Sequence, residues 1–141
     1  MKTLLLSWLS SLLLLNHPHS PNQPVQAQLI LYREKEFISG LGKAFPFKIN
    51  DKKTGKLSPN HYIQLPLAPG RIKIEFYNDY FTDSRPLWIQ VESGQTYYVK
   101  AVVEVDFWSS MMLMAPMPAQ QALPELRRMK PEAAHASPQP E

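Results

Sequence analysis

The feature that most constrains this fold is a pair of apolar-alternating segments within residues 61–78, separated by a proline-glycine corner. In the second segment apolar residues alternate with charged ones, the pattern of a strand with one face on a sheet core and the other in water. Pro69 presets φ for a turn and Gly70 permits positive φ, so the chain can reverse there. We therefore expect a β-hairpin at the centre of a small β-sandwich. The apolar positions are Ile72, Ile74 and Phe76, and the charged positions are Arg71, Lys73 and Glu75.

Length and composition exclude several classes of protein. At 141 residues the chain is long enough for one domain. It has no cysteine, which excludes disulfides, thiolate metal sites, thiol nucleophiles and a lipid anchor on a lipobox cysteine. The formal charge of +3 is too small to indicate a nucleic-acid partner, which usually needs a basic stripe.

The N-terminus has the features of an export signal, to which we assign residues 1–27. Lys2 supplies the positive start, and Leu4 to Leu15 form an apolar core broken only by serines. This core is shorter than the roughly 20 residues that a membrane-spanning helix needs. We expect cleavage after Ala27, because small residues occupy the first and third positions of Val25-Gln26-Ala27. The mature protein is then periplasmic or secreted with no transmembrane span; an uncleaved anchor is the alternative, since the polar segment before Ala27 is long.

Residues 28–128 have the pattern of a single β domain. About seven short strands with turn signals between them predict an all-β fold, an immunoglobulin-like or prealbumin-like antiparallel β-sandwich. Asn, Asp and Gly in residues 50–55 suit a hairpin tip. The longest strand is expected mid-sheet, because its outward face also carries Tyr98 and Val102. We expect strands at residues 29–33, 45–49, 56–67 with a break at 58–60, 71–76, 87–91, 97–105 and 111–114.

The C-terminal part is less regular. Within residues 107–128 we expect the closing strand and one helical turn cut by Pro124. Residues 129–141 are rich in Pro, Ala, Glu and Ser. Such a tail buries too little apolar surface to offset its ordering entropy, so we expect it to be disordered.

Tyr97 begins a predicted strand three residues after the turn glycine Gly94. In immunoglobulin-like sandwiches a tyrosine at such a place forms the tyrosine corner, where its phenol hydrogen-bonds back to the connecting loop. We assign this role to Tyr97, which shares the inward face of Val99. An ordinary buried tyrosine is the alternative.

Three groups of residues, taken in their order and spacing, resemble the domain-of-unknown-function family 2846. They are Leu31-Tyr32-Arg33 with Phe37-Ile38-Ser39-Gly40, Tyr62-Ile63 leading to Leu67-Ala68-Pro69-Gly70, and Ser93-Gly94-Gln95-Thr96-Tyr97-Tyr98-Val99. The resemblance covers residues 29–105 and implies an exported or lipid-anchored bacterial envelope protein. It implies no catalytic residues, because the family has no established activity. Its members often carry a lipobox, which this chain lacks.

The remaining residues disfavour an enzyme, a cofactor and a metal site. Only His61 and His135 follow the predicted leader. His61 stands at a strand start with no nucleophile elbow nearby, so we predict a turn histidine and keep a hydrolase as a distant alternative. Asp79 and Asp83 lack the ligand spacing and glycine of an EF-hand loop. No glycine-rich phosphate-binding motif occurs.

Two features are candidates for binding. A basic patch around the hairpin could meet anionic headgroups or cell-wall polymers, or it could protect an edge strand from pairing with another chain, which we favour. Exposed aromatics could form an interface or a sugar-stacking surface, unless residues 107–117 fold over and bury them. The basic residues are Lys48, Lys52, Lys53 and Lys56. The aromatic set is Tyr77, Tyr80, Phe81, Trp88, Tyr98 and Trp108, of which Trp88, Tyr98, Tyr80 and Phe81 form the predicted binding surface.

The sequence thus predicts a non-catalytic exported β-sandwich module of the bacterial cell envelope. The first hypothesis is a protein partner, engaged through an exposed strand edge or the face of Trp88 and Tyr98. The alternative is a carbohydrate- or cell-wall-binding module that uses the same aromatics.

Overall fold

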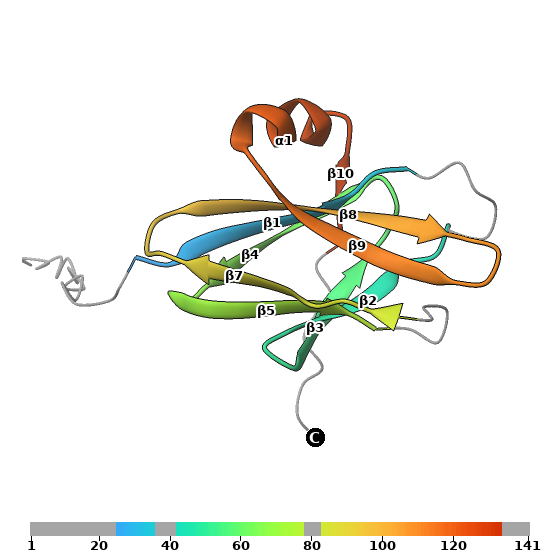
Figure 1. Cartoon of the computed structure of the whole chain (residues 1–141). Coiled ribbons are helices and arrows are strands. Elements are labelled where there is room, and N and C mark those ends of the chain that lie inside the picture. Colours follow the sequence, from blue (N-terminus) through green and yellow to red (C-terminus); the bar gives the residue numbers. More distant parts are fainter. Residues whose placement is uncertain (1–24, 36–41, 78–82, 134–141) are drawn as a thin grey trace, which may run out of the picture.

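The computed structural model describes residues 25–35, 42–77 and 83–133. Within these ranges the chain forms ten strands and one helix, arranged as two stacked sheets with the helix on the outer side of the larger one (Figure 1). The elements are β1 Ala27–Arg33, β2 Phe45–Ile49, β3 Lys52–Leu57, β4 His61–Leu67, β5 Gly70–Phe76, β6 Asp83–Ser84, β7 Leu87–Val91, β8 Thr96–Val105, β9 Ser110–Met117, α1 Ala119–Leu126 and β10 Lys130–Pro131.

The predicted β-sandwich is confirmed. One sheet has six strands in the order β10-β4-β1-β8-β9-β6, and the other has four in the order β3-β2-β5-β7. The four-stranded sheet is antiparallel. The six-stranded sheet is mixed, because β1 pairs in parallel with β8 and the two-residue strands β10 and β6 pair in parallel with β4 and β9. As expected, the long strand β8 lies inside its sheet.

The alternation along β5 places the core as predicted. Ile72, Ile74 and Phe76 are buried between the sheets, and the charged residues between them face outward. From the other sheet, Val99 and Ala101 of β8 are buried against the same core. Burial of these side chains supplies the main stabilisation, roughly 1.5–3 kcal/mol for each large aliphatic or aromatic side chain.

The predicted hairpin at the proline-glycine corner is wrong in one respect. β4 lies in the six-stranded sheet and β5 in the four-stranded sheet, so the corner carries the chain from one layer to the other. Gly70 has φ of 132°, a conformation that only glycine adopts readily. The turn residues therefore specify a reversal, and the core between the layers decides that the two strands lie in different sheets instead of pairing.

The turn between β2 and β3 is tighter than expected. The tip consists of Asn50 and Asp51 alone, with φ of 49° and 67°, the values of a two-residue type I′ turn. Gly55 lies within β3 instead of in the turn. A Cβ there would come into contact with the ring of Phe47, at 3.4 Å.

The tyrosine corner is present. The backbone N–H of Glu92 donates a 2.8 Å hydrogen bond to the hydroxyl of Tyr97. Glu92 belongs to the connection between β7 and β8, which crosses from the four-stranded to the six-stranded sheet. The phenol of Tyr97 therefore ties the crossover loop to the start of β8, as the sequence predicts.

The expected leader boundary coincides with the first residue of the sandwich. Ala27 begins β1, is fully buried and pairs with Leu67. The carbonyl of Val25 accepts a 3.1 Å hydrogen bond from the N–H of Gly94. Cleavage after Ala27 would remove these contacts from the domain. Residues 1–24 lie outside the described ranges.

The closing segment is more regular than predicted. β9 runs from Ser110 to Met117 and includes Pro116. α1 continues past Pro124 to Leu126, since the missing proline N–H removes only the bond to the carbonyl four residues earlier. Among the described residues no helix is long and apolar enough to cross a bilayer.

The start of the predicted disordered tail is part of the fold. The N–H groups of Lys130 and Glu132 donate to the carbonyls of Asn60 and Tyr62 at 3.1 and 2.7 Å. The carboxylate of Glu132 also accepts hydrogen bonds from the N–H and hydroxyl of Ser58, at 2.8 and 3.0 Å. These specific bonds order residues 129–133, which composition alone could not show. Residues 134–141, including His135, lie outside the described ranges.

Candidate functional site

The outer surface of the four-stranded sheet gathers aromatic and basic side chains from all four of its strands. Cross-strand partners share a face of a sheet, and here Lys73 pairs with Trp88, and Lys48 pairs with Lys53 on one side and Glu75 on the other. We call this surface the cation–aromatic face. Its members are Lys48, Lys53, Arg71, Lys73, Tyr77 and Trp88.

Trp88 is held between two cations and still reaches solvent. The guanidinium carbon of Arg71 lies 4.5 Å from the centre of its ring, and Nζ of Lys73 lies 5.8 Å from it. The side chain remains 50% exposed. Such contacts contribute about 0.5–1 kcal/mol at exposed sites, so the indole is positioned before any ligand arrives.

Tyr77 forms a second group of the same kind towards β2 and β3. Nζ of Lys48 and Nζ of Lys53 lie 4.6 and 5.8 Å from its ring centre. The ring therefore contacts two lysines that are cross-strand partners in the β2–β3 pair. Together the two groups give this face an excess of positive charge.

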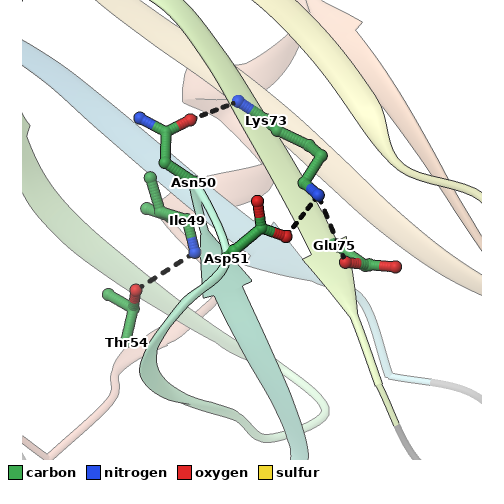
Figure 2. Close-up of polar contacts among 6 residues, drawn as sticks. All are labelled: Ile49, Asn50, Asp51, Thr54, Lys73 and Glu75. Atoms are coloured by element: carbon green, nitrogen blue, oxygen red, sulfur yellow. Dashed lines mark hydrogen bonds and ion pairs between the residues drawn. The ribbon is translucent and has the colours of Figure 1, made fainter.

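The β2–β3 tip is fastened to β5 around Lys73 (Figure 2). The side-chain oxygen of Asn50 accepts a 2.9 Å hydrogen bond from the N–H of Lys73, whose carbonyl accepts one of the same length from the N–H of Asn50. Nζ of Lys73 binds the carboxylate of Asp51 and lies 3.9 Å from that of Glu75. The hydrogen bond to Asp51 raises the pKa of Lys73, although desolvation opposes it. The tip thus fixes the spacing of the cations on this face.

The structure separates Trp88 from Tyr98, which the sequence placed on one binding face. Trp88 lies on the outer face of the four-stranded sheet, and Tyr98 lies half-buried on the outer face of the six-stranded sheet. Each residue does point outward from its strand, but the strands belong to different layers. The other two predicted members, Tyr80 and Phe81, lie outside the described residues.

The predicted basic patch is divided between a face and an edge. Lys48 and Lys53 belong to the cation–aromatic face. Lys52 and Lys56 are exposed on β3, which is the edge strand of its sheet. Lysines on an edge strand discourage pairing with another chain, so their position suits the edge-protecting role as well as binding.

An aromatic tip lies at the turn between β8 and β9; the sequence analysis named Trp108 among its exposed aromatics but not Phe107, and it placed neither on the predicted binding surface. Phe107 is 100% exposed and Trp108 is 94% exposed. The turn is closed by a 2.8 Å hydrogen bond from the N–H of Asp106 to the carbonyl of Ser109. We call Phe107 and Trp108 the aromatic tip. The hypothesis that residues 107–117 cover the outward aromatics is wrong, since β9 instead extends the six-stranded sheet beside β8.

Helix α1 covers part of the outer face of the six-stranded sheet (Figure 1). The hydroxyl of Tyr32 donates a 2.8 Å hydrogen bond to Glu125, and Nζ of Lys100 lies 3.1 Å from Glu125 and 3.0 Å from Glu34. Burial and the bond to Glu125 raise the pKa of Tyr32. Burial lowers the pKa of Lys100, but its hydrogen bonds to Glu34 and Glu125 outweigh that effect and leave it raised.

Arg33 is a buried charge that the sequence analysis treated only as a strand end. It is fully buried, its guanidinium carbon lies 4.4 Å from the ring centre of Phe45, and it donates a 2.8 Å hydrogen bond to the carbonyl of Lys43. These contacts help to hold the guanidinium inside the sandwich, so we interpret Arg33 as a structural residue.

His61 lies in the position expected of a turn histidine. Its Nδ1 is 2.8 Å from the carbonyl of Pro59, a contact in which Nδ1 must carry the proton and donate. The side chain thus closes its own turn. In the described part of the chain, no group of three or more His, Cys, Asp or Glu side chains could hold a metal ion.

One family model matches the chain over residues 24–112, and its description is "Protein of unknown function (DUF2846)". The match spans β1 to the start of β9 and includes the cation–aromatic face and the aromatic tip. No curated protein matches the chain.

Proposed function

The chain belongs to the DUF2846 family of proteins of unknown function, and from this premise we propose that it is a non-catalytic, exported β-sandwich module of the bacterial cell envelope that binds a protein partner. The observation that carries the proposal is the full exposure of Phe107 and Trp108 at the end of the β8–β9 ribbon. Export is supported by the leader pattern of residues 1–27, which would direct the domain to the periplasm or outside the cell.

The aromatic tip has the chemistry of an interface anchor. Large exposed apolar groups that lie together mark interaction sites, and aromatic residues dominate the binding energy of protein interfaces. Burial of a large aromatic side chain contributes about 1.5–3 kcal/mol. Two such residues can offset part of the cost of association, estimated at about 4–15 kcal/mol.

The expected partner therefore presents an apolar pocket that is large enough for an indole. A photo-crosslinking amino acid at position 108 should capture one reproducible envelope protein in living cells. The same amino acid at Gln90, which is exposed on β7, serves as the control position and should not capture it. With the purified partner, Trp108→Ala should weaken binding about 30-fold, the effect of losing a hot-spot residue. Equal affinity of Trp108→Ala and wild type would refute the proposal.

A carbohydrate- or cell-wall-binding module is the second candidate, favoured by the half-exposed indole of Trp88 beside Arg71 and Lys73. The flat ring could stack on a sugar, and the cations suit an anionic wall polymer. Sedimentation with purified cell walls separates the two candidates. Loss of binding in Trp88→Ala but not in Trp108→Ala would favour the wall, whereas absence of binding by wild type would eliminate this candidate.

A further inference from the structure

A groove of about 600 Å³ lies between β3, the edge strand of its sheet, and β4, which only the two-residue strand β10 separates from the edge of the other sheet. Its walls are residues 52–55 of β3 and residues 62–65 of β4, and Pro131 and Glu132 close one end. It is distinct from the aromatic tip, which belongs to β8 and β9. The groove offers two kinds of contact, an open strand edge and a set of side chains.

The open edge belongs to β4. On one side β4 pairs with β1 along its whole length. On the other side, within the described residues, it pairs with β10 only at His61 and Tyr62. The carbonyl of Tyr62 accepts a hydrogen bond from the N–H of Glu132 on that side. Backbone groups of a strand alternate in direction, so Gln64 turns its N–H and carbonyl to the same side and into the groove.

The side chains of the groove select the chemistry of an occupant. Ile63 and Leu65 are half-buried on the floor. Across from them Gly55 contributes no side chain, and a Cβ there would be in contact with the δ-carbon of Ile63, at 3.7 Å. Lys52 and Lys53 are exposed at the rim. The carboxylate of Glu132 keeps its charge while it accepts hydrogen bonds from Ser58, but the two lysines outnumber it, so the lining carries an excess of positive charge.

We propose that this groove binds an extended acidic peptide of a partner protein by adding it as a strand to the edge of β4. The peptide backbone bonds to Gln64, alternate aliphatic side chains rest on Ile63 and Leu65, and a carboxylate lies near Lys52 and Lys53. β10 is the precedent within the molecule, because it already pairs with the same edge as a short parallel strand. Recognition by strand addition takes affinity from the backbone and specificity from every second side chain.

Peptide display tests the proposal while the partner is still unidentified. Random peptides of about ten residues, enough for one strand, are selected on the purified full-length protein. The expected consensus alternates aliphatic residues with other residues and contains Asp or Glu. Addition of a selected peptide should slow hydrogen exchange at the amide of Gln64. Failure to enrich any peptide, or enrichment of basic ones, would overturn the proposal.

Matched variants locate the binding. Gln64→Pro removes the N–H that faces the groove, whereas Gln64→Ala retains it, and only the former should weaken binding, by about threefold to tenfold. Lys52→Glu should weaken acidic peptides at least about threefold. Lys56→Glu, an exposed change on the same strand outside the groove lining, should not. If Gln64→Pro binds as well as Gln64→Ala, and Lys52→Glu binds as well as Lys56→Glu, the proposal is overturned.

Two further proteins complete the design. Trp108→Ala should bind the selected peptides as wild type does, so the groove is tested independently of the aromatic tip. A chain ending at Ala133 should also bind them with unchanged affinity. If selection enriches peptides on this shortened chain but not on the full-length protein, the chain's own C-terminal residues compete for the edge, and the proposal of a partner peptide is wrong.

Discussion

Replacement of Tyr97 by phenylalanine removes one hydrogen bond and leaves the ring in place, so it isolates the contribution of the tyrosine corner. The bond lost is the 2.8 Å contact from the N–H of Glu92 to the phenol oxygen. It joins the loop between the two sheets to the beginning of β8. A weaker corner should therefore destabilise the whole sandwich rather than a single strand.

The expected loss is about 1 kcal/mol, within the range of roughly 0.5–1.5 kcal/mol for a net intramolecular hydrogen bond. It should not approach the larger cost of a buried unsatisfied group, because Glu92 is exposed and water can replace the lost acceptor. For a domain of roughly 100 residues, a loss of about 1 kcal/mol lowers Tm by about 4 °C or somewhat more. Urea unfolding followed by tryptophan fluorescence should show a lower midpoint with an unchanged m-value.

Tyr98→Phe is the matched control. It removes the same atom from the adjacent residue, which lies on the outer face of the six-stranded sheet. It should change the free energy of unfolding by less than about 0.5 kcal/mol, the usual effect of a surface substitution. If Tyr97→Phe and Tyr98→Phe are equally stable, the corner bond does not hold the two sheets together and the inference from its geometry is wrong.

Three further predictions concern stability. Ile74→Ala should cost about 2–5 kcal/mol, as measured in urea, because Ile74 is fully buried between the sheets. Glu125→Gln should lower Tm by a few degrees, since it weakens the contacts that dock α1 through Lys100. Because the pKa of Tyr32 is raised in the folded state, the unfolded chain loses this proton first; stability should be intact below about pH 10 and fall above it. In thermal melts between neutral and alkaline pH, the fall of Tm with rising pH should be less steep for Tyr32→Phe than for wild type. An equally steep fall in both proteins would contradict the role given to Tyr32.

Much of the fold can be predicted because its determinants are local. Ile72, Ile74 and Phe76 carry a period of two that places them on one face whatever the tertiary structure. Gly94 and Tyr97 predict the corner because its hydrogen-bonded partners are five residues apart. The turn at Asn50 and Asp51 is predictable for the same reason, although its length is overestimated. In each case all the residues that determine the feature lie within one strand or within one turn and the strands beside it.

The errors concern long-range pairing. Pro69 and Gly70 specify a reversal equally well for a hairpin and for a crossing between sheets, and only the interior between the layers separates the two. The parallel pairing of β1 with β8 joins residues far apart in the sequence, beyond the range of any local pattern. Order in residues 129–133 likewise depends on Ser58 and Tyr62, which a composition argument cannot include.

For the candidate sites too, the local pattern was predictable and the long-range pairing was not. This difference determines how the sites should be tested. Alternation shows correctly that Trp88 and Tyr98 point outward, but outward from two different sheets means towards opposite sides of the molecule. The true neighbours of Trp88 are Arg71 and Lys73, set by the register between β5 and β7. A double mutant of Trp88 and Tyr98 would therefore perturb two unrelated surfaces and give additive effects. Coupling is expected instead between Trp88 and Arg71, whose side chains are in contact.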